Sequence, residues 1–160
     1  MRKPSFLSKL KEEGKLGLVE PSEEICNSYL RKADDCLKSA KVLCQNDLFE
    51  NSISMSYYAM YNSLTALLFR VGIKCENHAG TILLLKRLFR RIDLFRTISF
   101  AKDERIDKQY YVTPISTQES AQDIFTKAED FLIQLKLIIK KLGTMEIESI
   151  RRNLKAILAE

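Results

Sequence analysis

The sequence predicts an all-α fold, an antiparallel four-helix (up-and-down) bundle with additional short terminal helices. Three observations support this prediction. Long segments repeat their apolar residues at steps of three and four positions, which is the period of an amphipathic helix. Only five glycines and three prolines occur in 160 residues, which favours long regular elements over a loop-rich β fold. No segment alternates apolar and polar residues in the way that a half-buried strand requires.

The long helices are predicted over residues 23–44, 49–70 and 117–142. Ser22 is the expected N-cap of the first, because two acidic residues follow it in the first turn. Within the second, residues 57–70 are apolar nearly all round, so we expect this helix inside the bundle, in contact with several others. Residues 116–119 have the spacing of a capping box, which predicts the start of the third helix.

Shorter segments are predicted between and before these helices. Residues 5–13 have an apolar side and are expected to form a short helix. Gly72 is the expected stop of the central helix, and a further helix follows at about residues 80–92. Residues 97–114 contain a polar stretch at 102–111 and end at a proline, so we expect a short helix and a loop there.

The C-terminal part is predicted to be an extra helix over residues 144–159, outside a bundle core at about residues 22–142. The chain length favours a single domain over residues 1–160. Eight side chains are expected in the core: Tyr58, Leu64, Leu67, Leu68, Leu85, Phe125, Phe131 and Leu135.

The charge balance is mildly basic, with a net charge of +5 and an isoelectric point near 9.0. Such a surface is compatible with nucleic acid or with an acidic protein partner, and equally with a solvated surface rich in lysine. The N-terminal segment is polar and basic, and no run approaches the roughly 18 apolar residues of a membrane-spanning helix. We therefore expect a cytoplasmic protein that does not enter the membrane.

The cysteines give no sign of a metal centre or a disulfide. They are Cys26, Cys36, Cys44 and Cys75, and none lies in a C-x-x-C pair. We expect free thiols, no bound metal and no cofactor. His78 is the only histidine, so any imidazole chemistry near neutral pH depends on this residue.

Several segments together resemble the HEPN family (higher eukaryotes and prokaryotes nucleotide-binding domain), over about residues 28–142. The segments with the strongest resemblance are Tyr29-Leu30-Arg31-Lys32-Ala33, Ser56-Tyr57-Tyr58-Ala59-Met60-Tyr61 and the stretch from Gly72 to Gly80 that contains His78. The resemblance implies a helical bundle that dimerises. It also implies either a metal-independent ribonuclease of the toxin type or a non-catalytic partner of a small nucleotidyltransferase.

The family's catalytic pattern places an arginine before a histidine, at a shorter spacing than the seven residues that separate Arg70 from His78 here. The resemblance implies Arg70 and His78 as the catalytic pair. Two alternatives stay open, namely Lys74 as the cation and a site without activity. Arg105 and Asp107 also fit the family, and they form either a structural ion pair or part of the same cleft.

His78 is expected in the first turn of a helix capped by Asn77. A helix N-terminus disfavours a protonated imidazole and attracts anions, which suits a general base acting on the 2′-hydroxyl of RNA. Lys74, Asn77, Arg105 and Asp107 are the expected substrate-binding residues. The alternative is a histidine that only hydrogen-bonds to its turn.

Two functions are therefore expected. One is the toxin-like component of a HEPN/nucleotidyltransferase pair, an endoribonuclease that uses His78. The other is a non-catalytic module that binds a nucleotide or the nucleotidyltransferase. A homodimer is expected because the last helix and the tyrosine-rich face of the central helix have no obvious partner within the chain. The tyrosines are expected in the core or at an interface rather than stacked on bases.

Overall fold

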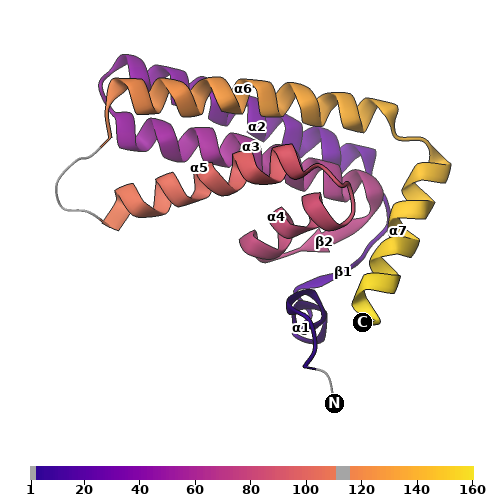
Figure 1. Ribbon diagram of the computed structural model, residues 1–160. Coiled ribbons are helices and arrows are strands. Elements are labelled where there is room, and N and C mark those ends of the chain that lie inside the picture. Colours follow the sequence, from indigo (N-terminus) through magenta and orange to yellow (C-terminus); the bar gives the residue numbers. More distant parts are fainter. Residues whose placement is uncertain (1–2, 111–115) are drawn as a thin grey trace.

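Helices make up most of the computed structural model, which describes residues 3–110 and 116–160 (Figure 1). In chain order the elements are α1 (Phe6–Glu12), β1 (Leu16–Leu18), α2 (Glu23–Gln45), α3 (Phe49–Val71), β2 (Ile73–Cys75), α4 (His78–Arg87), α5 (Ile92–Tyr110), α6 (Gln118–Lys141) and α7 (Thr144–Leu158). The predicted all-α fold is confirmed. Across the described ranges, none of the helices combines the length and the apolar character that crossing a membrane requires.

Helix α3 is the centre of the bundle and packs against α2, α5 and α6 (Figure 1). It forms an antiparallel hairpin with α2 through a turn in which Asp47 has a φ angle of 60°. The fully buried side chains of α3 cover more than one stripe of the helix, because Ala59 and Ala66 are 0% exposed as well as Ile53 and Met60. This position explains why residues 57–70 carry so few polar side chains.

The predicted long helices are confirmed, and so are the predicted start of α2 at Ser22 and the predicted end of α3 at Gly72. The Ser22 hydroxyl accepts a hydrogen bond from the Ile25 N–H at 3.1 Å, and Gly72 ends α3 with a φ angle of 75°. At the start of α6, Thr117 is the N-cap, but Ser120 rather than Glu119 completes the capping box. The Ser120 hydroxyl, one residue after Glu119, therefore accepts the hydrogen bond that the Glu119 carboxylate was expected to accept.

Six of the eight predicted core residues are buried, and two are not fully enclosed. Leu64, Leu67, Leu68, Leu85, Phe131 and Leu135 have exposed fractions of 2% or less. Tyr58 and Phe125 are only half-buried. Tyr58 turns its hydroxyl toward Arg105 on α5, whereas its neighbour Tyr57 points into the core and is 0% exposed.

The prediction for the third helix was wrong in its bounds. Helix α4 ends at Arg87, Arg90 adopts a φ angle of 54°, and α5 begins at Ile92. Residues 97–114 were expected to form a short helix and a loop, but α5 continues through them to Tyr110. The remaining residues of that segment, 111–114, lie outside the described residues. The helix forms because its few apolar side chains pack on α3. Leu94, Ile98 and Ala101 have exposed fractions of 3% or less.

A two-stranded sheet, which the sequence did not predict, connects the N-terminal segment to the end of α3. Strands β1 and β2 pair antiparallel, with Leu16 opposite Cys75 and Leu18 opposite Ile73. Each strand has three residues, too few to show an alternating pattern. The pairing continues into the Glu76 N–H, which donates to the Lys15 carbonyl at 2.8 Å, so the chain that leads to α4 is fixed.

Helix α7 has partners within the chain, contrary to the expectation. Its Ile147 and Leu154 are buried in a second apolar cluster together with Leu7 of α1. The Arg151 guanidinium donates from Nη1 to the carbonyl oxygens of Val19 and Gly72, at 2.8 Å each, and of Val71 at 3.2 Å. The arginine thus ties α7 to the end of α3 and to the chain after β1.

Candidate functional site

His78 is the first residue of α4, and the local structure fixes its backbone. Asn77 is the N-cap, with its Oδ1 accepting from the Gly80 N–H at 2.8 Å. The Cys75 thiol in β2 lies 3.6 Å from the Asn77 carbonyl oxygen, and the Thr81 hydroxyl donates to the Cys75 carbonyl at 3.4 Å. The predicted cap is confirmed, and the Asn77 side chain acts locally in this turn.

The imidazole of His78 lies against two tyrosines of α3. Its Nδ1 is 2.8 Å from the Tyr57 Oη. Its ring stacks on Tyr61, with 3.9 Å between ring centroids and an interplanar angle of 9°. Tyr57 and Tyr61 are one helical turn apart, so both face α4. The contact with the Tyr57 hydroxyl fixes the direction in which Nδ1 points. The stacking on Tyr61 fixes the plane of the imidazole ring.

Arg105 of α5 brings a positive charge to the same tyrosines. Its Nη1 donates to the Tyr58 Oη at 2.8 Å. Its guanidinium carbon lies 5.2 Å from the ring centroid of Tyr57 and 5.1 Å from that of Tyr58, which is the geometry of a cation–π contact. The Arg105 Nε is buried and has no hydrogen-bond partner among the described side chains. Arg105 therefore lies beside the site, and its Nε–H does not donate a hydrogen bond to any group in the described part of the chain.

The electrostatics of the site keep both His78 and Tyr57 neutral near pH 7. Burial lowers the pKa of His78 below its ordinary 6.5, and the positive charges of Arg105 and Lys102 lower this pKa further. Burial raises the pKa of Tyr57, so its phenol stays protonated. A neutral imidazole donates from one ring nitrogen and accepts at the other. If Nδ1 donates to the Tyr57 oxygen, the lone pair of Nε2 is free to accept a proton.

The structure does not bring Arg70 to His78. Arg70 lies nine positions beyond Tyr61 on α3, about 13 Å along the axis and on the opposite side of the helix. Its charge acts on Cys26, where it opposes the burial that raises the pKa of this thiol. Helix geometry therefore separates the two residues that the family pattern pairs. Within the described part of the chain, the positive charges that act on His78 are those of Arg105 and Lys102.

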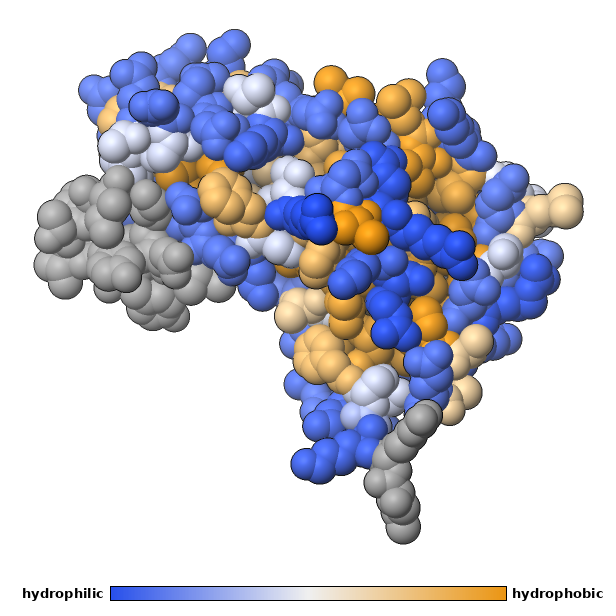
Figure 2. Space-filling view, in the orientation of Figure 1, coloured by the Kyte–Doolittle hydropathy of each residue, from blue (hydrophilic) through white to orange (hydrophobic). Residues whose placement is uncertain are grey.

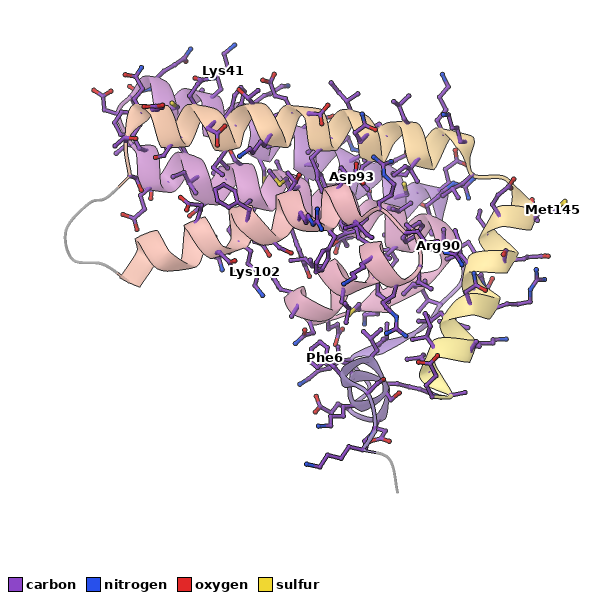
Figure 3. The ribbon with its side chains drawn as sticks, viewed as in Figure 1. Phe6, Lys41, Arg90, Asp93, Lys102 and Met145 are labelled. Atoms are coloured by element: carbon purple, nitrogen blue, oxygen red, sulfur yellow. The ribbon has the colours of Figure 1, made fainter. Side chains whose placement is uncertain are left out.

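The other expected site residues have different surroundings. Lys74 forms an ion pair with Glu76 at 2.7 Å, and both side chains are about half exposed, at 52% and 54%. The side chain of Asp107 lies outside the described residues, so its predicted ion pair with Arg105 stays a prediction. Lys102 was not expected at the site. It lies three positions before Arg105 on α5 and projects on the side of α4 (Figure 3).

The sequence contained only a weak signal for this arrangement. Tyr57 and Tyr61 are spaced to share one face of a helix, and so are Lys102 and Arg105, but nothing local indicates that these faces meet at His78. In the described ranges, His, Cys, Asp and Glu side chains do not gather in groups of three or more that could hold a metal ion. Cys26, Cys36, Cys44 and Cys75 are free thiols, and Cys26 is buried.

Comparison with known proteins finds relatives over most of the chain. A UPF0332 protein of Thermotoga maritima is 26% identical over 129 residues, which cover 78% of this chain and 98% of the relative. A protein of Methanocaldococcus jannaschii named "Putative toxin MJ0605" is 29% identical over 127 residues, covering 75% of this chain and 92% of the relative. The family model of the HEPN domain matches residues 26–138, which include α3, α4 and α5 with His78, both of its tyrosine partners and Arg105. The chain thus belongs to the HEPN domain family.

Proposed function

We propose that the protein is a toxin-like endoribonuclease of the HEPN type, in which His78 acts as general base without a metal ion. The main support is the environment of the imidazole, which is half-buried, neutral, oriented by Tyr57 and flanked by Arg105 and Lys102. A base of this kind must be unprotonated at neutral pH, and a phosphate needs positive charge beside it. The name of the Methanocaldococcus relative as a toxin supports the biological class.

The proposed reaction is an internal transesterification. Nε2 of His78 takes the proton of an RNA 2′-hydroxyl, and the 2′-oxygen then attacks the adjacent phosphorus. The bond from phosphorus to the 5′-oxygen breaks, and this leaving oxygen takes a proton from water. The imidazolium of His78 then returns its proton to the solvent. The products are a 2′,3′-cyclic phosphate and a 5′-hydroxyl. Arg105 replaces Arg70 in this proposal as the cation that stabilises the charge on the phosphate oxygens.

Incubation of the purified full-length protein with RNA in EDTA tests this function. We expect cleavage to continue in EDTA and the products to end in a cyclic phosphate and a 5′-hydroxyl, identified by mass spectrometry. Tyr57→Phe is the sharpest companion variant, because it keeps the buried ring and removes only the oxygen next to Nδ1. Its turnover should fall while RNA binding stays close to that of the wild type. RNA that remains intact both with and without EDTA would refute the ribonuclease.

A homodimer remains part of the proposal, with a different surface from the one first expected. Ile147 and Leu154 of α7 and the ring of Tyr57 are covered within the chain, whereas Ile133 and Leu137, one turn apart on α6, are 56% and 46% exposed. Figure 2 shows apolar atoms along the edge of the molecule over this helix. We expect sedimentation equilibrium to give a dimer at micromolar concentration and Ile133→Glu to shift it to monomer. Met145→Glu, at a side chain 81% exposed on α7, is the control. A wild-type monomer would refute the dimer.

The second candidate is a non-catalytic module that binds a nucleotide or a small nucleotidyltransferase in the cytoplasm. It is favoured by the contacts of His78 with Tyr57 and Tyr61, which a purely structural histidine would also make. Cleavage by the purified protein separates the two candidates. Binding of a nucleotidyltransferase would be compatible with both, because a toxin can be held inactive by such a partner.

A further inference from the structure

A groove of about 300 Å³ lies beside the His78 site, between α1, α4 and α5. Ala79, the residue after His78, lines this groove, and so does Lys102, whose charge acts on His78. The groove therefore lies next to the candidate site. Part of its wall comes from Phe6 on α1, which precedes the residues matched by the family model. The volume is at the small end of ligand pockets, a size that suits one flat ring system.

The walls of the groove are apolar and aromatic. Phe6 and Phe95 contribute phenyl rings, and Leu83 lies with them on the α4 side. Phe6, labelled on α1 in Figure 3, is 45% exposed although it lines the groove together with Leu83 and Phe95. Figure 2 shows apolar surface over α1 and α4, bordered by hydrophilic side chains. Exposed aromatic rings next to positive charge are the usual platform on which proteins stack nucleic-acid bases.

The polar side of the groove comes from one face of α5, where Ser99, Lys102 and Asp103 follow at positions i, i+3 and i+4. The Asp103 carboxylate is exposed and has no ion-pair partner within the described side chains. It can accept hydrogen bonds, whereas the Lys102 ammonium donates and the Ser99 hydroxyl does either. The groove thus offers one acceptor group next to two donor groups.

Guanine matches this pattern better than the other bases. Its N1–H and its N2 amino group are adjacent donors that a carboxylate can accept together, and its O6 and N7 are acceptors for an ammonium or hydroxyl. Adenine and cytosine offer a single amino group instead, and uracil offers a single ring N–H without an amino group beside it. We propose that this groove binds the guanine of the nucleotide next to the phosphate at His78. The inference rests on the proposed function for the nature of the substrate.

Binding of 2′-O-methyl oligonucleotides tests the groove independently of cleavage. Three uridine oligonucleotides that contain one guanine, one inosine or one adenine are titrated by fluorescence anisotropy. Inosine lacks only the N2 amino group. We expect the guanine oligonucleotide to bind about 5- to 150-fold more tightly than the other two. Asp103→Asn should remove the preference over inosine, and Phe6→Ala should weaken guanine binding by at least about fivefold.

Matched variants control for changes elsewhere on the surface. Phe100→Ala removes a phenyl ring of the same 45% exposure, which contacts Lys127 rather than the groove. Asp123→Asn removes an exposed carboxylate on α6. Both should keep the preference for guanine. Three outcomes would overturn the proposal that this groove binds guanine. They are equal binding of the three oligonucleotides, no binding of any of them, and a guanine preference that Phe6→Ala and Asp103→Asn leave intact. A guanine preference in a protein that leaves 2′-hydroxyl RNA uncut would instead refute the ribonuclease and support the groove.

Discussion

Replacing His78 by alanine is expected to lower the rate of RNA cleavage by about 10²–10⁴-fold, the usual contribution of general acid–base catalysis. The fold should remain intact, because the side chain is half-buried at the edge of the bundle and Asn77 still caps α4. Single-turnover cleavage rates measure the loss, and circular dichroism checks the fold. A His78→Ala variant as fast as the wild type would refute the proposed role of the imidazole.

The pH dependence of the same reaction gives a second readout. The unprotonated imidazole is the active form, and burial together with Arg105 and Lys102 lowers its pKa from 6.5. The rate should therefore fall on the acid side with a midpoint below pH 6.5. Arg105→Gln removes one of these charges, so it should raise the pKa of His78 and move this midpoint upward, in addition to slowing turnover.

Arg70→Gln, compared with Arg105→Gln, decides which arginine serves the site. The structure places Arg105 against Tyr57 and Arg70 near Cys26. We expect only the change at Arg105 to move the acid midpoint and to lower turnover more than RNA binding. If Arg70→Gln produced both effects and Arg105→Gln neither, the family pairing would hold and the assignment of Arg105 would be wrong.

The second large effect is expected in stability. Leu67 of α3 is 0% exposed in the main core, so Leu67→Ala removes methyl groups from a position packed on all sides. The free energy of unfolding should fall by about 2–5 kcal/mol, as lost burial and a residual cavity add together. Urea denaturation followed by circular dichroism measures the change at an unchanged m-value.

Leu48→Ala is the control for this substitution. It is the same chemical change at a side chain that is 48% exposed, before the first turn of α3. We expect its effect to stay within about 0.5 kcal/mol. A similarly small loss for Leu67→Ala would show that the packing around the middle of α3 differs from the structure described.

The sequence alone determined the long helices and the position of His78. Ser22, Gly72 and Asn77 act on hydrogen-bonding groups within their own turns, so their effects can be recognised locally. The apolar character of residues 57–70 likewise predicted a central helix. The full length of helix α5 could not be predicted from the sequence, because only a few apolar side chains, such as Ile98 and Ala101, pack it on the bundle.

Only the tertiary structure decided which side chains surround the imidazole. The hydroxyl of Tyr57, the ring of Tyr61 and the charge of Arg105 come from two other helices, and their meeting depends on how α4 and α5 pack on α3. The family spacing pointed to Arg70, which is closer in sequence but turned to the far side of α3. Charges act through space with a strength set by distance and burial, and neither can be inferred from spacing along the chain.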